Sequence, residues 1–222
     1  AARRRGRAPD WLARLGSVLG VSMPSFWLAL ILQIVFFGWL RLLPVAGRYD
    51  PNLDATHPLR TITHSVILDS ILTGNLAVLW SAVQHLVLPA IVLAAYPLGV
   101  VTLMVRASVL DTIGEDHIRM VRALGFPEKT VFGRFARRLA WNPVLAVIAL
   151  VFAYSLANSF LVEAIFNWPG LGNYAAASIA SLDTPAIVGV TLFVAVAYVA
   201  GNLVVDVVQA RSEEHTSELQ SR

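Results

Sequence analysis

The stretch HLVLPAIVLAAYPLGVVTLMV, residues 85–105, runs for 21 residues without an Asp, Glu, Lys or Arg. A bilayer core of about 30 Å is crossed by about 20 helical residues, so this run is typical of a transmembrane helix. Three further runs of similar length and apolar character lie at about 17–40, 139–162 and 185–208. Together they predict an all-α, polytopic membrane helix bundle with about four transmembrane helices.

The composition of the chain also indicates a membrane protein. The 222 residues are 57% hydrophobic and 14% charged, whereas about a quarter of the residues of a soluble domain are charged. Four such runs in one short chain make a buried helix of a soluble protein the weaker explanation. Cysteine is absent, which excludes disulfides, thiolate metal sites and a cysteine nucleophile. The pI near 9.7 comes almost entirely from arginine, which suits either nucleic-acid binding or membrane topology.

The positions of the basic residues decide between these two readings. Residues 1–16 carry five arginines and residues 106–138 carry seven basic residues, while 41–84 carries three and 163–184 none. The positive-inside rule therefore predicts that 1–16 and 106–138 are cytoplasmic and that 41–84 and 163–184 lie outside. Topology accounts for the arginines, so we expect no nucleic-acid partner.

Both ends of the chain carry unusual sequence. The chain opens inside a basic segment without an initiator methionine, which predicts a fragment. At the other end, polar RSEEHTSELQSR (211–222) follows the last apolar run. Its first eleven residues match the translation of a common sequencing-library adapter. We therefore expect 211–222 to be non-native and the transmembrane domain to comprise 17–210.

The segment between the second and third apolar runs predicts a helix-turn-helix. Apolar residues recur near helical spacing from Thr112, which predicts a short amphipathic helix with its apolar side inward. Gly125 ends that helix, and Pro127 begins a second one. The residues expected to face inward are Ile113, Ile118, Val121 and Leu124 in the first helix and Val131, Phe132, Phe135 and Leu139 in the second. Arg134, Arg137 and Arg138 are expected to be exposed.

Local signals elsewhere predict shorter features. Segment 41–84 is too polar to span and is expected to hold one or two short helices. Residues 168–172 form a Trp-Pro-Gly-Leu-Gly turn, which a helix of small residues follows. Thr184 is a candidate N-cap for the last span. Small residues four apart, at Gly16/Gly20 and Ala95/Gly99, predict close helix packing.

The loop EDHIRMVRALGFPEKTVFGRFARRLAWNP, 115–143, resembles the cytoplasmic loop of ABC-importer permease subunits of the dipeptide/oligopeptide/nickel group. That loop has an acidic-aromatic start, an R-x-A-R-A-x-G core and an Asn-Pro close. Gly125 and Pro143 are eighteen residues apart here, as in that group. This sequence departs from the pattern at His117, Val121 and Leu124, where a tyrosine, a small residue and a lysine are usual.

Other blocks resemble the same family in the same order. They are GVSMPSFWLALIL (20–32), LPVAG (43–47), HLVLPAIVLA (85–94), RASVLDTI (106–113), VEAIFNWPGLG (162–172) and NLVVDV (202–207). The resemblance covers about 17–210. The family has six spans, of which two would precede residue 1, in agreement with the fragment expectation.

The resemblance implies a permease subunit of an ATP-driven importer of peptides or a related small solute, nickel included. Its implied partners are a second permease subunit or a second copy, two cytoplasmic ATPase subunits, an extracytoplasmic binding protein and membrane lipid. The implied location is the cytoplasmic (inner) membrane of a bacterium or archaeon. The chain has no G-x-x-x-x-G-K-[ST] phosphate loop. It is therefore expected to be no enzyme and to bind no cofactor, with ATP and Mg on the partner subunits.

The resemblance also assigns two sets of residues. The ATPase-coupling set forms a docking helix and turn and comprises Glu115, Asp116, Arg119, Arg122, Ala123, Gly125 and Phe126. Ala123 and Gly125 are expected to allow close approach and the turn. The outer-mouth set comprises Asn167, Trp168, Pro169, Gly170 and Gly172, for which a plain surface turn is an equal alternative.

Other chemistry is weakly indicated. Asn158, Glu163, Asn202 and Asp206 are polar groups near the spans, which suit either a substrate pathway or interfacial placement. The histidines show no ligand spacing, and no catalytic or metal site is expected. A secondary transporter and an intramembrane enzyme remain the alternatives. A secondary transporter would keep charged or unwound sites at mid-membrane, whereas the distinctive residues here lie in one loop.

Overall fold

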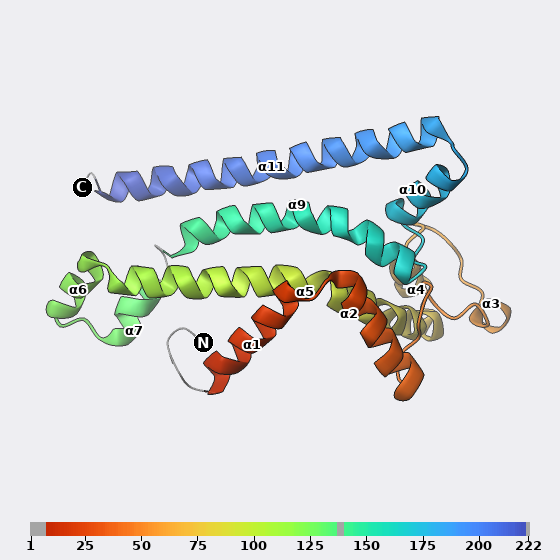
Figure 1. The fold of residues 1–222 in the computed structure, drawn as a ribbon, viewed down its shortest axis with the longest axis horizontal. Coiled ribbons are helices and arrows are strands. Elements are labelled where there is room, and N and C mark those ends of the chain that lie inside the picture. The colour runs from red at the N-terminus through yellow and green to blue at the C-terminus, as the bar shows by residue number, and fades with distance from the viewer. Residues whose placement is uncertain (1–7, 137–139, 221–222) are drawn as a thin grey trace. The chain divides into compact units, whose positions relative to one another are not determined.

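The computed structural model describes residues 8–136 and 140–220, and these contain helices and no strand. The predicted all-α class is confirmed. In chain order the elements are α1 (Ala8–Ser22), α2 (Ser25–Leu32), η2 (Gln33–Trp39), α3 (Leu53–Thr56), α4 (Val66–Leu72), α5 (Leu76–Gly114), α6 (Asp116–Ala123), α7 (Glu128–Thr130), η3 (Val131–Ala136), α9 (Trp141–Ile165), α10 (Leu171–Ala180) and α11 (Thr184–Gln220) (Figure 1). The η elements are π-helices.

Two helices of the described chain are each long and apolar enough to cross a membrane, α5 and the Thr184–Val204 part of α11. A third span is present if the bent pair Trp11–Ser22 and Ser25–Trp39 counts as one. The described apolar part of α9, Leu150–Ile165, is shorter. The predicted runs at 85–105 and 185–208 thus lie within long helices, and the run at 17–40 is broken.

The break in the first run lies at Met23 and Pro24. Pro24 has no N–H and an extended ψ of 135°, so the helix stops there. Its carbonyl then accepts the amides of Trp27 and Leu28, each at 3.0 Å, and α2 begins at once. The predicted single span is therefore two helices.

The cap of the last helix differs from the prediction by one residue. The Ala186 amide donates to Asp183 Oδ1 at 3.2 Å, and the Ile187 amide donates to the Asp183 carbonyl at 3.0 Å. Thr184 is already the first helical residue. The N-cap is thus Asp183, whose carboxylate reaches the third helical amide as capping side chains do.

The chain divides into two compact units. One comprises Ala1–Ser22, Ala95–Ser155 and Leu192–Arg222, and the other Met23–Ala94 and Leu156–Thr191. The helices α5, α9 and α11 each contribute to both.

In the first unit, α1 packs closely on α5 through the predicted small residues. A Cβ placed on Gly20 would lie 2.6 Å from the Ala95 carbonyl oxygen, and one on Gly99 would lie 2.8 Å from the Ser17 carbonyl oxygen. Only glycine permits backbones to come this close. Gly16 has open space around it, so the contact depends on the other three members of the predicted set.

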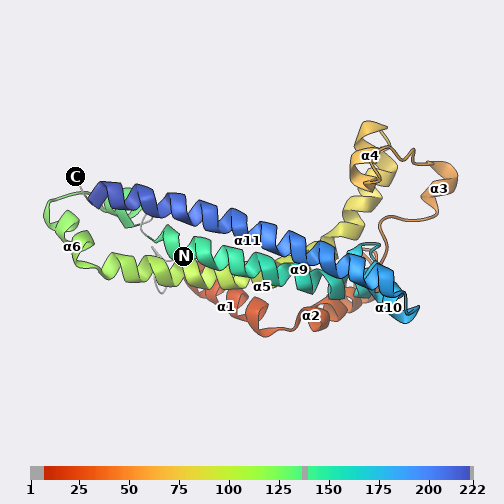
Figure 2. The ribbon, with the colours of Figure 1, turned by 90° about the horizontal axis from the view of Figure 1, so that it is seen from above.

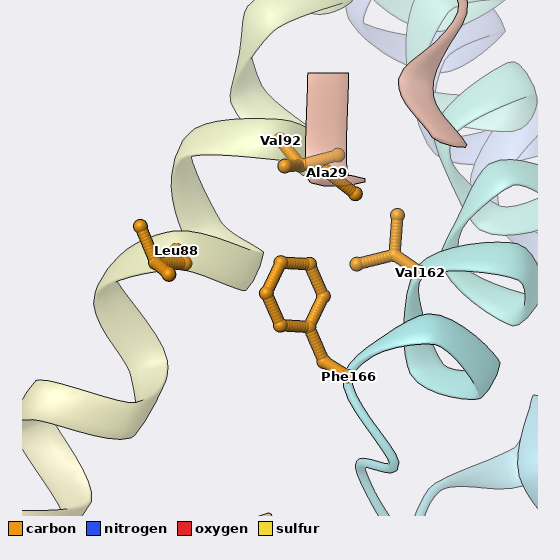
Figure 3. Close-up of a cluster of buried hydrophobic side chains, with 5 residues drawn as sticks. All are labelled: Ala29, Leu88, Val92, Val162 and Phe166. Atoms are coloured by element: carbon orange, nitrogen blue, oxygen red, sulfur yellow. The ribbon is translucent and has the colours of Figure 1, made fainter. Parts of the chain in front are cut away.

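In the second unit, a cluster of fully buried side chains joins α2, α5 and α9. Figure 3 shows Phe166 facing Ala29, Leu88, Val92 and Val162. All five are at most 1% exposed. This cluster fixes the end of α9 from which the turn at 167–172 departs.

The predicted short helices of segment 41–84 are α3 and α4, which lie near the start of α5 (Figure 2). Asp69 of α4 is fully buried, and its Oδ1 accepts both the amide and the hydroxyl of Thr63 at 2.7 Å. Burial alone would raise the pKa of Asp69, but the hydrogen bonds to its carboxylate lower the pKa by more than burial raises it. The pKa of Asp69 therefore lies below the ordinary value. Asp69 thereby fixes the loop that precedes α4.

Replacing Gly20 with alanine tests the contact between α1 and α5. We expect Gly20→Ala to lower the free energy of unfolding by about 1–3 kcal/mol, because the methyl group would overlap the Ala95 backbone. Gly16→Ala is the control, since alanine there meets nothing and is favoured over glycine in a helix by about 0.5–1 kcal/mol. Thermal unfolding of the purified permease in detergent measures both variants. Equal stability of the two would contradict the close packing.

Candidate functional site

The predicted helix-turn-helix lies at the C-terminal end of α5 (Figure 2). Helix α5 continues to Gly114, and Glu115 takes an extended conformation with φ −71° and ψ 151°. Helix α6 then runs from Asp116 to Ala123. Gly125 has φ +82°, a left-handed conformation that favours glycine. We refer to residues 115–136 as the knob.

The inward face of α6 follows the predicted period. Ile118 is 0% exposed and forms a buried cluster with Val131 and Ala136 of η3. Ile113, Val121 and Phe135 pack around this cluster. Phe132 is half-buried, while Leu139, Arg137 and Arg138 and the side chain of Arg134 lie outside the described residues.

Polar and aromatic contacts brace the knob across its turn. Arg122 Nε donates to Glu128 Oε1 at 2.8 Å, which joins α6 to α7. The rings of Phe126 and Phe135 meet edge to face, with their centroids 6.0 Å apart. The predicted coupling residues Arg122 and Phe126 therefore each make an internal contact.

A second anchor lies where the knob rejoins the spans. Ser108 Oγ of α5 donates to the carbonyl of Ala140 at 2.8 Å, and this bond is buried. It ties α5 to the residue that directly precedes α9. The two helices that flank the knob, α5 and α9, are thus held together beside it.

The outward face of the knob carries large apolar side chains. Met120 and Leu124 are each 65% exposed and Phe126 is 45% exposed, and Ala123 is exposed beside them. The prediction that Leu124 faces inward was wrong. Because α6 ends at Ala123 and Gly125 turns the chain, Leu124 leaves the inward face. We name Met120, Ala123, Leu124 and Phe126 the outer patch.

Ionisable side chains of the knob form exposed local pairs. Arg119 Nη1 lies 3.2 Å from Asp116 Oδ1, and His117 Nδ1 lies 3.1 Å from Glu115 Oε2. Such exposed pairs contribute about 0–1 kcal/mol, so they exchange partners at little cost. The structure thus brings the seven predicted coupling residues together in one knob.

The predicted outer turn is organised by a residue whose role the sequence left open. Glu163 Oε2 of α9 accepts the amide of Gly172 at 2.6 Å and that of Asn173 at 3.2 Å. These are the second and third amides of α10, so Glu163 caps a helix nine residues further along. A Cβ on Gly170 would overlap this carboxylate, and one on Gly172 would overlap Phe160.

Further bonds hold the same turn. The Gly47 amide donates to the Phe166 carbonyl at 2.9 Å, and Arg48 Nη2 donates to the Pro169 carbonyl at 3.4 Å. Asn167 itself has φ +45°, and Trp168 is half-buried. The turn is therefore pinned to the segment after the first apolar run.

Sequence reasoning missed Gln33, which lies in the π-helix η2. Its Nε2 donates to the Val45 carbonyl at 2.9 Å and to the Ile165 carbonyl at 3.4 Å. An amide within an otherwise apolar run was the available signal. Π-helical turns often occur where a side chain must be positioned, and here one presents Gln33 to two loop carbonyls.

The other polar groups near the spans differ in whether another residue binds them. Asn158 Oδ1 accepts the Ser25 hydroxyl at 2.6 Å, so it links α9 to α2. Asn202 is half-buried and Asp206 is exposed on α11. Within residues 8–136 and 140–220, no group of three or more His, Asp or Glu side chains is placed to hold a metal ion.

An all-α membrane protein with a braced loop helix and a capped outer turn matches a known class. The chain belongs to the family of binding-protein-dependent transport system inner membrane components, whose model matches residues 1–218. Similar proteins are the probable D,D-dipeptide transport system permease protein DdpB of Escherichia coli K12, 40% identical over 202 residues, and the dipeptide transport system permease protein DppB of Alkalihalophilus pseudofirmus, 37% identical over 197. The oligopeptide transport system permease protein AppB of Bacillus subtilis is 31% identical over 204 residues.

These matches cover 91%, 89% and 90% of this chain respectively. They cover 58%, 58% and 57% of the relatives. The chain thus spans less than two thirds of the length of these relatives. The expected family is confirmed, and its members are transport components of membranes.

Removing the Glu163 carboxylate tests the cap of α10. We expect Glu163→Ala to speed amide exchange in the first turn of α10 about tenfold or more, because a hydrogen bond to a charged group contributes about 1.5 kcal/mol or more. Glu163→Gln keeps one acceptor oxygen, so its amide exchange rate should lie between those of the parent protein and Glu163→Ala. Hydrogen–deuterium exchange with mass spectrometry, read on peptides that cover 170–180, measures this effect.

The matched control for this test is Asp183→Ala, which removes the cap of α11 instead. It should leave exchange in 170–180 unchanged and speed exchange at the start of α11. Unchanged exchange in Glu163→Ala would show that the carboxylate does not hold α10.

Proposed function

We propose that the chain is part of a permease subunit of an ATP-driven importer, that it contributes to the pathway for peptides, and that a separate ATPase drives it through residues 115–126. Membership of the family and the dipeptide and oligopeptide names of the relatives support this proposal. The excess of basic residues in 1–16 and 106–138 supports a cytoplasmic location for both segments. The membrane would be the inner membrane of a bacterium or archaeon.

The observation that carries the proposal is the outer patch. Met120, Leu124 and Phe126 lie in a charged loop that positive-inside counting predicts to face water, yet all three are 45–65% exposed. Burying one such side chain is worth about 1.5–3 kcal/mol. A groove of a partner protein that covered the patch would gain this energy, and the flanking charges would supply a polar rim.

The bracing of the knob explains how a partner could act at a distance. Force on the outer patch would reach the buried cluster of Ile118, Val131 and Ala136 because these side chains interlock. The bond from Ser108 to Ala140 would pass displacement to α5 and to the start of α9. Movement of packed elements as rigid bodies is how such importers would alternate between inward-facing and outward-facing states.

The remaining partners follow from this assignment. Two ATPase subunits would hold ATP and Mg²⁺, so this chain would itself catalyse nothing. A second permease subunit or a second copy would complete the pathway. A binding protein outside the membrane would deliver the cargo near 167–172. Nickel is a second cargo that the same transport assay would test, although its ligands would lie mainly on the binding protein.

A charge placed in the outer patch tests the coupling role. We expect Ala123→Asp, in the complete permease with its ATPase, to reduce ATPase co-purification and peptide uptake about tenfold or more, because an unpaired carboxylate buried at an interface costs several kcal/mol. Gly125→Asp should reduce both as well, with an added fold penalty of about 1–2 kcal/mol for a side chain in a left-handed conformation.

Two controls separate docking from folding. Ala123→Ser keeps a small uncharged residue, and Lys129→Ser alters an exposed position of α7 outside the patch; both should retain uptake. Ala123 is exposed, so thermal unfolding of Ala123→Asp should match the parent protein. Normal ATPase association and uptake in Ala123→Asp would refute the coupling role.

A further inference from the structure

A groove in the second unit combines an apolar lining with two polar side chains, the exposed Arg41 and the half-buried Gln84. It has a volume of about 590 Å³ and is lined by Phe37, Leu42, Leu43 and Pro44 together with Arg41 and Gln84. Neither the Arg41 guanidinium nor the Gln84 amide makes a hydrogen bond or an ion pair with another residue in the described part of the chain. Among the described residues, those that line the groove carry no carboxylate.

Arg41 fixes the depth of the groove. It directly follows the first apolar run, whereas Gln84 lies within α5, directly before the run that begins at His85. Residue 41 is thus where an apolar run gives way to the connecting segment 41–84. A basic residue at the end of an apolar run lies near the depth of lipid headgroups, whichever face of the membrane that is.

The surface around Arg41 is apolar. Trp39, Leu40 and Leu42 are 77%, 52% and 61% exposed, so the apolar surface continues on both sides of the arginine. Tryptophan is enriched at membrane interfaces, and arginine extends its head from apolar surface toward headgroups.

The donors of the groove select the chemistry of the ligand. A guanidinium and a side-chain amide together offer N–H donors to the oxygens of a phosphate. The described residues of the lining offer no acidic side chain to pair with an ammonium group, which disfavours a headgroup that carries one. We propose that this groove binds the phosphate of an anionic phospholipid of the phosphatidylglycerol type, with acyl carbons along Phe37 and Leu42.

Arg41 also offers a variant that removes the side chain without straining the fold. Its φ is +51°, a conformation that glycine adopts more readily than arginine. Arg41→Gly should therefore fold at least as well as the parent protein. Arg41→Lys keeps the charge and should keep most of the binding.

The test is lipid retention by the complete permease, measured by native mass spectrometry after release from nanodiscs that contain equal phosphatidylglycerol and phosphatidylethanolamine. The parent protein should retain phosphatidylglycerol preferentially. Arg41→Gly should reduce that retention about fivefold, the effect of one arginine at an anionic lipid surface, and Gln84→Leu should also reduce it. The control is Arg60→Gln, an exposed arginine of the same connecting segment outside the groove, which should behave as the parent protein does.

Three outcomes would overturn the proposal. Unchanged phosphatidylglycerol retention in Arg41→Gly would show that the groove is not the site. Equal retention of phosphatidylethanolamine by the parent protein would refute selection for an anionic lipid. Displacement of the lipid by a dipeptide, but not by its C-terminal amide, would assign Arg41 to a peptide carboxylate instead. Loss of ATPase coupling is measured separately, so failure of this proposal leaves the coupling test intact.

Discussion

Backbone hydrogen bonding in an apolar surrounding constrains this chain more than any other interaction, because hydrocarbon offers no water to an unpaired N–H or C=O group. Two departures from regular helix show how replacement partners are supplied. At the Pro24 break, the proline carbonyl accepts two amides of the next helix. Where the chain turns after the first apolar run, the side-chain amide of Gln33 donates hydrogen bonds to the carbonyls of Val45 and Ile165.

The elements best predicted from sequence are those that the composition of their own residues determines. Length and absence of charge alone define the runs at 85–105 and 185–208, and both lie within long helices. The broken run at 17–40 has the same composition but contains Pro24, whose effect depends on what accepts the freed groups. Asp183 and Thr184 are both good caps in isolation, and only the geometry of α11 distinguishes them.

The knob shows the same limit at the level of a site. Ile118 and Val121 were predicted inward correctly, because a period of 3.6 residues places them on one face. Leu124 obeys that period in sequence, yet the helix has ended before it, so the residue adds to the outer patch. Periodicity also carries no information about Glu163, whose partners belong to a different helix.

Polar residues in membrane segments are often taken as functional, but here the structure divides them by whether a partner exists. Glu163, Asn158 and Gln33 each form hydrogen bonds with other segments of the chain and hold those segments together. Arg41 and Gln84 lack such partners within the described chain, in a groove that is otherwise apolar. The outer patch is the opposite case, because its apolar side chains are exposed in a charged loop. At both places the fold leaves groups that a molecule from outside the chain would contact: polar donors in an apolar groove, and exposed apolar side chains in a charged loop. Residue type alone predicts neither, because each is defined by what the fold leaves unpaired.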